Sequence, residues 1–511
     1  MAQNAIVINV DIGETRVALI ENGIIAELAV ERRRSRSLVG NIYLGKVTRV
    51  LPGMQAAFVD VGLDRAAFLH VSDVIRPEDL ANLAGEDGDD DEDEGSTDGR
   101  EPRVRRIDKS TPIREVLKEG QSIVCQISKG PISTKGARVT SHVSLPGRYV
   151  VYMPLDDSIG ISKRIGNDRE RARLREAIES MRPPQGGLVV RTVAAGLTKK
   201  QLRADIGYLV KLWGDIMKSQ KEVTRAPALI YEDLDIILRA ARDHFGVEVD
   251  KIVIDDEREY TRLKQFATSF MAERAEAIEL YTGDEPIFDE YGIEDEIGRA
   301  LSRKVPLPSG GHLIIDQAEA LTAIDVNTGR FVGRTKDVDE TILQTNLEAV
   351  KEIAYQLRFR NIGGLIVLDF IDMERPQHRD KVHKALVEAF KTDKAKTTTV
   401  RISELGLVEM TRKRTRDSLG RQLNEPCFYC DGTGQLQSKE TICHEIVRQI
   451  RREKDSIQGY KIVVNAHPAV ADFLNHEERD ALHEIQRRFA RTVVVQGRKD
   501  YHLEQFDLQG A

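Results

Sequence analysis

Two short apolar runs that each end in an acidic residue are the feature that most constrains how this chain folds. The first run, residues 321–327, contains Asp325, and the second, residues 365–372, contains Asp369. Both are typical of buried strands, whereas residues 342–357 between them repeat apolar side chains every three or four positions, as one face of a helix does. Such a strand, helix, strand unit is nearly always a right-handed crossover between parallel strands. The pattern therefore predicts that both acids lie at one edge of a single sheet.

Two carboxylates at a sheet edge predict a site for a hard divalent cation. Magnesium typically takes one or two protein carboxylates and keeps its other positions for water or phosphate oxygens, which phosphoryl chemistry requires. An acid after a strand can instead cap a turn or pair with arginine, and for either acid alone that interpretation is favoured. The pair, with Asn327 two residues after Asp325, favours a magnesium site.

Length and charge set the class of protein. A chain of 511 residues is too long for one ordinary core, so several domains are expected. No segment approaches the roughly 20 apolar residues of a membrane span, and the N-terminus lacks a signal-peptide pattern, which predicts a cytoplasmic protein without a membrane partner. The net charge of −7 includes an acidic block at residues 86–98 with nine acidic and no basic residues, so the remainder carries +2.

The acidic block contains only Asp, Glu, Gly, Ser and Thr, which predicts a disordered insert over residues 85–106. We interpret it as a solvated surface insertion. Mimicry of RNA, in competition for a basic groove, is the alternative.

Short strands separated by turns predict an OB-fold barrel between residues 41 and 129. These strands cover residues 43–47, 56–62, 66–70 and 123–127. Aromatic side chains on such a barrel can stack on exposed bases, each contributing about 1–3 kcal/mol, while lysines hold the RNA backbone. Phe58 and Phe68 are the candidates for stacking, with Lys46 and Lys135 as cationic support. From the pattern alone, both phenylalanines could equally be core residues.

Two further basic segments suit phosphate groups. A charged helix over residues 168–182 is followed by an apolar strand that ends in Arg191 and Thr192, a guanidinium fork beside a hydroxyl donor. Helices are expected at residues 198–225 and 234–245, and a strand at 251–254. The run at residues 411–416, with Arg412 and Arg414, is either a solvated helix face or a contact to the phosphate backbone of a nucleic acid.

A C-x-x-C motif at Cys427 and Cys430, followed by two glycines, is typical of a zinc knuckle. Tetrahedral zinc needs four ligands. Cys443 and His444 could complete the set only with awkward geometry, and Cys443 has the pattern of a helix-core residue. A thioredoxin-like redox pair is disfavoured because the motif does not open a helix after a strand. We therefore expect two chains to share one zinc ion in a homodimer, with tetramers as an open alternative. Residues 461–506 have the pattern of a small mixed domain.

Several motifs together resemble the ribonuclease E/G family over almost the full length of the chain. They are residues 40–43, 51–60, 134–138, 323–329, 369–373 and 406–414. The resemblance implies a magnesium-dependent endoribonuclease that cleaves single-stranded, A/U-rich RNA, prefers 5′-monophosphorylated ends and leaves 5′-phosphate and 3′-hydroxyl products. It also implies a role in the 5′ maturation of rRNA precursors and in mRNA decay.

The resemblance further implies an α/β multidomain architecture. The expected parts are an RNase H-like subdomain in two segments (1–37 and 237–300), an inserted OB-fold domain (38–141), a 5′-sensor subdomain (142–236), a DNase I-like catalytic subdomain (301–423), a zinc link (424–437) and a small α+β dimerisation domain (438–511). The acidic insert departs from the family pattern. The long scaffold arm with which one family member assembles a degradosome has no counterpart in this sequence.

Site residues follow from the same resemblance. The positions of Asp325 and Asp369 bind magnesium in the family, and that of Asn327 assists. A 5′-monophosphate is bound at the positions of Arg191 and Thr192, in a pocket lined by those of Gly147 and Val151. Lys396 stands where another member has arginine, so it keeps the charge but loses the bidentate fork. Phe58, Phe68 and Lys135 match RNA-holding positions, and Cys427 and Cys430 match the shared zinc link.

Overall fold

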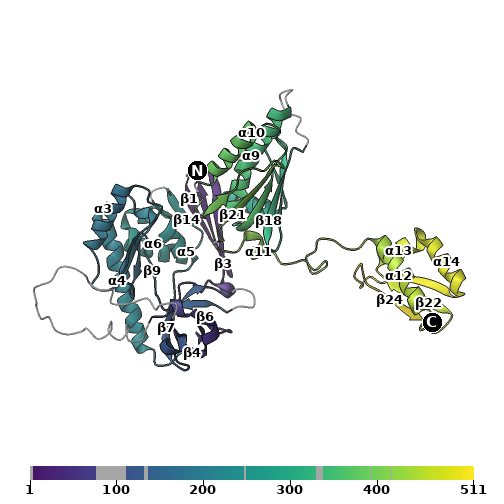
Figure 1. Cartoon of the computed structure of the whole chain (residues 1–511), viewed down its shortest axis with the longest axis horizontal. Helices are drawn as coiled ribbons and strands as arrows, with labels where there is room; N and C mark the ends of the chain where they lie inside the picture. The colour runs from purple at the N-terminus through teal and green to yellow at the C-terminus, as the bar shows by residue number, and fades with distance from the viewer. Residues whose placement is uncertain are drawn as a thin grey trace, which may run out of the picture. The chain divides into compact units, whose positions relative to one another are not determined.

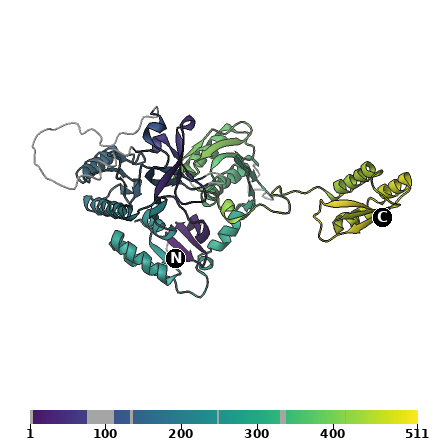
Figure 2. The same cartoon turned by 90° about the horizontal axis from the view of Figure 1, so that it is seen from below.

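Five β-sheets organise the part of the chain that the computed structural model describes, which is residues 4–75, 111–131, 136–246, 249–329, 338–391, 393–414 and 416–511. The acidic block at 86–98 and Lys135 lie outside these residues. The chain divides into two compact units, Met1–Gly420 and Arg421–Ala511. Figures 1 and 2 show both units from two directions. No helix among the described residues is long and apolar enough to cross a membrane.

The first sheet joins two segments that are far apart in sequence. Its antiparallel meander consists of β1 (Ala5–Val10), β2 (Glu14–Glu21) and β3 (Ile24–Arg32), and β14 (Lys251–Ile254) pairs parallel to β1, followed by β15 (Ile278–Leu280). Figure 1 shows β1 beside β14. Helices α5 (Ile236–His244) and α6 (Glu257–Met271) contribute apolar residues to the core of this sheet. Helices α7 (Ile287–Glu290) and α8 (Ile293–Leu301) follow.

A closed barrel follows the first three strands. It consists of β4 (Ile42–Leu51), β5 (Ala56–Asp60), β6 (Ala67–His70), β8 (Arg138–Thr140) and β7 (Ser122–Lys129), and β7 pairs back to β4. The short helix α2 (Ile113–Val116) precedes β7, and β13 (Ala228–Tyr231) extends the sheet at β4. The barrel that the strand spacing predicts is therefore confirmed.

The next sheet has the order β11-β12-β10-β9, formed by β9 (Leu145–Pro146), β10 (Val150–Met153), β11 (Ile159–Ile161) and β12 (Gly187–Val190). Helices α3 (Asp168–Glu179) and α4 (Lys199–Glu222) pack apolar residues into the core of this sheet. Both helices begin with a side-chain N-cap, Asn167 and Thr198 respectively, which satisfies the first free N–H groups. The helices expected from the charged and amphipathic segments are confirmed.

The sheet that carries the two acids has the order β16-β17-β18-β19-β21-β20. Its strands are β16 (Lys304–Pro306), β17 (His312–Gln317), β18 (Leu321–Asn327), β19 (Gly364–Asp369), β20 (Thr397–Thr399) and β21 (Leu407–Arg412). Helix α9 (Val338–Phe359) joins β18 to β19, which pair in parallel, so the predicted strand, helix, strand unit is confirmed. Figure 1 shows α9 and α10 (Pro376–Ala389) along this sheet.

The interpretation of β18 and β19 as fully buried strands is wrong. Along β18, Thr322, Ile324 and Val326 are buried, whereas Ala323 and Asp325 are exposed. On β19 the side chain of Leu365 is 43% exposed. The residues of α9 and α10 share a core with the buried side chains of one face only. The other face is open, as is common for sheets that are mainly antiparallel.

The second unit is a small mixed domain. Its sheet has the order β23-β22-β24, with β22 (Lys461–Ala466) parallel to β23 (Thr492–Gly497) and antiparallel to β24 (Phe506–Gly510). Helices α12 (Lys439–Glu453), α13 (Pro468–His476) and α14 (Arg479–Phe489) supply the rest of its core. The short α11 (Leu419–Leu423) lies where the two units meet in sequence. The yellow part of Figures 1 and 2 shows this domain.

Candidate active site and nucleic-acid interface

The two strand-end acids lie directly opposite each other. Asp325 and Asp369 are register partners in the parallel pairing of β18 with β19, and both point to the open face of the sheet. The Asn327 amide shares that face and donates a hydrogen bond from Nδ2 to Asp325 Oδ2 over 2.8 Å. The structure therefore brings together all three residues that the sequence predicts for this site.

A fourth polar group, Asp372, belongs to this cluster and was not assigned from the sequence. Desolvation, followed by the charges of Asp325 and Asp372, raises the pKa of Asp369 above its usual value. Carboxylates that repel one another in this way gain from a divalent cation between them. The spacing of Asp372, three residues after Asp369, is the signal that could have identified it.

A buried amide fixes the loop that carries these acids. Asn346 on α9 is fully buried, and its side chain donates to the Ile371 carbonyl over 2.9 Å and accepts from the Ile371 N–H over 3.1 Å. This clamp holds the backbone between Asp369 and Asp372. The sequence signal was a polar residue at an apolar-face position of the helix, between Leu343 and Leu347.

Arg412 does not lie on the RNA-facing surface that the sequence suggested. The expected helix face is wrong, because Thr411 and Arg412 end strand β21. Strand alternation places Arg412 on the helix-covered face of β21, where its side chain is only 5% exposed. Its Nε and Nη2 donate to the Asp393 carboxylate over 2.7 and 3.1 Å, and Nη1 donates to the Ile362 carbonyl over 2.8 Å. Arg412 is therefore a structural residue. Arg414 is exposed, donates from Nε to the Gly363 carbonyl over 3.0 Å, and remains a candidate for binding phosphate.

Of the residues predicted to bind a 5′-phosphate, Arg191 lies directly after β12. Arg191 Nη1 donates to the Gly147 carbonyl over 2.7 Å and bonds Asp243 Oδ1 over 2.8 Å. The neighbouring Thr192 hydroxyl lies 2.9 Å from Ser162 Oγ. Val151 is half-buried on β10. Arg191 and Gly147 are thus in direct contact.

An acid that the sequence interpretation missed holds the backbone next to Gly147. Asp205 on α4 is buried and accepts hydrogen bonds from the backbone N–H groups of Arg148, Tyr149 and Val150 over 3.1, 2.8 and 2.9 Å. Burial raises the pKa of Asp205, against the lowering effect of the three amides and of Arg191. A Cβ at Gly147 would lie 2.6 Å from Asp205 Oδ2, so any side chain there would have to displace this carboxylate. The position of Asp205 on the apolar face of α4 is the sequence feature that could have identified it.

The loop that carries Lys396 contacts β3 and α5 through a different lysine. Lys394 Nζ lies 2.8 Å from Glu27 Oε1 and 3.0 Å from His244 Nδ1. Lys396 is exposed, and within the part of the chain described here no hydrogen bond or ion pair joins it to Arg191.

The two phenylalanines of the barrel lie on its outer face. Phe58 and Phe68 are opposite each other on β5 and β6, with ring centroids 6.3 Å apart in an edge-to-face arrangement. Both are half-buried, whereas Ala57, Val59, Ala67 and Leu69 beside them form the core. They are therefore not core residues.

Exposed cations flank this aromatic pair. Arg49 is the partner of Phe58 on β4, and Arg138 is the partner of Phe68 on β8. The side chain of Arg138 also forms an ion pair with Asp73 over 2.8 Å. Lys46 is exposed further along β4. The two arginines were missed because their pairing with the aromatic residues depends on strand register.

The Cys427–Cys430 segment forms a tight turn before α12. The Gly432 N–H donates to the Cys427 carbonyl over 3.0 Å, and the Gly434 N–H donates to Cys430 Sγ over 3.3 Å. The Gly434 N–H, followed by contact with the Cys427 thiol, lowers the pKa of Cys430 despite some desolvation. Such a turn favours the thiolate that zinc requires. Cys443 is buried in α12, where burial raises its pKa to about 11, as expected for a helix-core cysteine.

Comparison with known proteins agrees with this geometry. Residues 144–415 match the model of the ribonuclease E/G family, and residues 426–511 match that of the RNase E/G thioredoxin-like domain. The chain is 43% identical over 503 residues to Ribonuclease G of Escherichia coli (strain K12), covering 98% of this chain and 99% of that protein. It is 42% identical over 504 residues to Ribonuclease G of Haemophilus influenzae, covering 98% of each.

The chain belongs to the ribonuclease E/G family. Membership confirms the family that the sequence motifs indicate, and with it the expected activity class, an endoribonuclease. The sequence predicts a likeness to ribonuclease G in particular, which these identities confirm. Ribonuclease E of E. coli is 38% identical over 489 residues, which are 94% of this chain but 44% of that protein. The match to a thioredoxin-like domain concerns the fold of the second unit. The two cysteines lie outside any strand-to-helix turn, ahead of α12.

Proposed function

We propose that this family member is a magnesium-dependent endoribonuclease that cleaves single-stranded, A/U-rich RNA and leaves 5′-phosphate and 3′-hydroxyl ends. The observation that carries the proposal is the register pairing of Asp325 and Asp369 on the open sheet face. These two carboxylates would hold magnesium, while Asn327 keeps the Asp325 carboxylate oriented through its amide bond. When bound, the ion supplies Lewis-acid activation of water and stabilises the developing negative charge.

We propose that Arg191 and Thr192 bind the 5′-monophosphate of the substrate. Only Nη1 of the Arg191 guanidinium has protein partners among the described residues, so its other N–H groups can donate to phosphate oxygens. The Gly147 turn, held by Asp205, and Val151 would line the pocket. Lys396 would add positive charge from the adjacent loop.

For the RNA chain, we propose the outer face of the barrel. Phe58 and Phe68 would stack on successive bases, and Lys46 and Lys135 would contact the backbone. Arg49 and Arg138 support this assignment because they continue the same cross-strand row. Arg414 is the proposed phosphate contact near the catalytic sheet.

We propose that Cys427 and Cys430 bind zinc together with the same pair of a second copy, which makes the enzyme a homodimer. Two sulfurs on one turn supply half of a tetrahedral site. Among the described residues, neither cysteine lies in a cluster of three or more metal-ligating side chains, so their own chain supplies no further ligand to them. Native mass measurement should find one zinc per two chains in this link, lost together with the dimer in Cys427→Ser; a dimer that survives this change would contradict the shared site.

The remaining parts of the proposal concern layout and cellular role. The domain boundaries stated above, a cytoplasmic location, and action on rRNA precursors and mRNA are proposed from the resemblance to the family. The likeness to proteins named Ribonuclease G supports RNA as the substrate.

One cleavage assay tests the central claim. The full-length chain is incubated with one unstructured RNA, bearing a 5′-monophosphate or a 5′-triphosphate, with and without magnesium. Asp325→Asn and Asp369→Asn should abolish cleavage but retain RNA binding. Asp316→Asn is the matched control, since Asp316 is a half-exposed acid on β17 of the same sheet. Magnesium-dependent cleavage by either site variant would contradict the assignment.

The same assay separates the competing functions. An RNA-binding scaffold with structural acids would bind tightly without products, and a phosphoesterase of broader specificity would cleave the matching single-stranded DNA. Arg191→Ala should bring the ratio of the rates on the two 5′ ends close to one. Arg182→Ala, which alters an arginine paired with Asp157 in the same subdomain, should leave that ratio unchanged. An unchanged ratio in Arg191→Ala would remove Arg191 from the pocket.

A further inference from the structure

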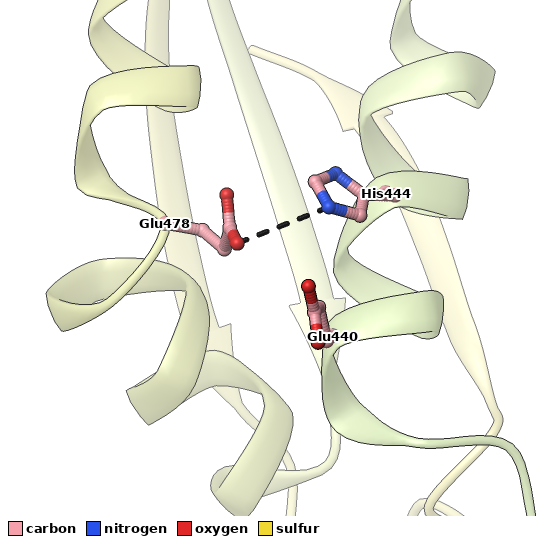
Figure 3. A group of neighbouring side chains, drawn as sticks. All are labelled: Glu440, His444 and Glu478. Atoms are coloured by element: carbon pink, nitrogen blue, oxygen red, sulfur yellow. Dashed lines mark ion pairs between the residues drawn. The ribbon is translucent and has the colours of Figure 1, made fainter.

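Three metal-ligating side chains converge in the second unit, away from the cysteine turn. Glu440 and His444 are four residues apart on α12, so they share one face of the helix, and Glu478 immediately precedes α14. One ligand atom from each lies within 4.8 Å of the other two, and His444 Nε2 is 3.9 Å from Glu478 Oε1. Figure 3 shows the three side chains pointing toward one another between the two helices.

The charges of this cluster are not balanced by the protein. Within the described part of the chain, neither Glu440 nor Glu478 forms an ion pair with lysine or arginine. The adjacent basic residues are engaged elsewhere: the Lys439 ammonium lies over the Phe473 ring, 5.6 Å from the centroid, and Arg479 Nε donates to His483 Nε2 over 3.1 Å. Two carboxylates this close with a single imidazole between them carry a net negative charge that a cation would neutralise.

Two other acids of the same unit are each paired with an arginine. Glu445 pairs with Arg448 over 3.2 Å, and Glu484 pairs with Arg487 over 3.0 Å. Glu478 also stands at the N-cap position of α14 without a side-chain capping bond. Its carboxylate is therefore not engaged in capping α14 and can bind a ligand.

We propose that Glu440, His444 and Glu478 form a binding site for a divalent transition-metal ion, with Zn²⁺ as the best match. Imidazole nitrogen together with carboxylate oxygens suits zinc, whereas magnesium prefers oxygen ligands alone. Zinc binds such atoms at about 2.0–2.2 Å, so ligand atoms must approach to roughly 3–4 Å of one another. Small rotations of these three surface side chains achieve this.

The ion would join the start of α12 to the start of α14 and would stabilise the packing of these helices. Three protein ligands leave the fourth position of a tetrahedral site for water. The site is separate from the cysteine turn, because neither sulfur belongs to this cluster. The proposed site binds one zinc ion per chain. A shared cysteine link would add one further zinc ion per two chains.

Equilibrium dialysis of the full-length chain against Zn²⁺, with metal content measured by mass spectrometry, tests the proposal. His444→Ala and Glu440→Gln should each lose one zinc per chain, and Cys427→Ser should retain it. His476→Ala is the matched control, because His476 is 72% exposed and pairs with Asp472 four residues earlier on α13, without a third ligand. Its zinc content should equal that of the unmodified chain.

Three outcomes would overturn the site. Equal zinc content in His444→Ala and the unmodified chain would show that the cluster holds no metal. An equal loss in His476→Ala would show that zinc binds surface histidines without selection. If Cys427→Ser by itself removed all the zinc, the cysteine link would be the only zinc site and the cluster would hold none. Failure of the shared-link proposal would instead appear as unchanged zinc content in Cys427→Ser, so the two results are distinguishable.

Discussion

Replacing Asp393 by asparagine should destabilise the first unit strongly while leaving its surface unchanged. The substitution keeps the size of the side chain but removes the charge that faces Arg412. Both side chains are almost completely buried, with 5% of Arg412 and 3% of Asp393 exposed. In the variant, the Arg412 guanidinium would remain charged in the interior without an opposite charge. Its hydrogen bond to the Ile362 carbonyl would be kept.

The magnitude follows from burial. Removing one partner of a buried ion pair costs about 3–5 kcal/mol, because the other charge is left without compensation. Exposed pairs contribute only about 0–1 kcal/mol. The chain contains a matched exposed pair: Arg303 and Asp316 also bond through two contacts, but 69% and 50% of these side chains are exposed. Asp316→Asn should therefore cost less than about 1 kcal/mol.

Urea denaturation of the full-length variants, followed by circular dichroism, measures this difference in the free energy of unfolding. Equal losses in Asp393→Asn and Asp316→Asn would refute the argument from burial. RNA affinity provides a second test. If Arg412 bound phosphate, Asp393→Asn would release it and strengthen RNA binding at little cost in stability. We expect instead that Arg414→Ala, at normal stability, lowers affinity and reduces the salt slope of binding by about 0.7, as for one phosphate contact of a single strand.

Three further predictions follow from the sites. Because the Asp369 carboxyl has a raised pKa, it holds its proton more tightly in the folded than in the unfolded chain, so it opposes folding increasingly as pH rises above the ordinary carboxyl pKa of 3.8. At neutral pH and without magnesium, the Asp369→Asn variant should therefore melt no lower than the unmodified chain. It should, however, lose the rise in melting temperature that magnesium produces in the unmodified chain. Calorimetry with and without the ion checks this, and an unchanged magnesium effect would contradict it. Phe58→Ala and Phe68→Ala should each weaken binding of single-stranded RNA by about 1–3 kcal/mol, measured by fluorescence anisotropy, with little change in melting temperature because both rings lie on the surface. Gly147→Ala should displace the Asp205 carboxylate, lower the melting temperature and reduce the preference for 5′-monophosphorylated RNA; a normal preference would show that this turn does not shape the pocket.

Much of the fold was predictable from local patterns. The limits of β18, the helix that follows it and the parallel partner β19 all correspond to the periodicity of apolar residues. The same is true of the strands that form the barrel. These patterns are informative because a side chain's position along a helix or strand decides whether it can face a core. The pairing of Asp325 with Asp369 followed from the handedness of one crossover.

Several site assignments needed contacts between distant parts of the chain. Arg412 and Arg414 stand in one basic run, yet only the second is exposed, because β21 turns Arg412 toward the covered face and Asp393 meets it there. Asp205 and Asn346 looked like isolated polar residues on apolar helix faces, until the backbone groups that they bind were placed beside them.

The sequence by itself determined the strand, helix, strand unit over residues 321–372, the strands of the barrel and the meeting of two acids at a sheet edge, since these depend on residue periodicity and on short connections. Only the tertiary structure decided which face of each strand is covered, which arginines are buried, and that Phe58 and Phe68 lie on the surface between two arginines. The physical reason is that burial and ion pairing depend on what packs against a residue. Those neighbours come from elements whose positions local sequence does not specify.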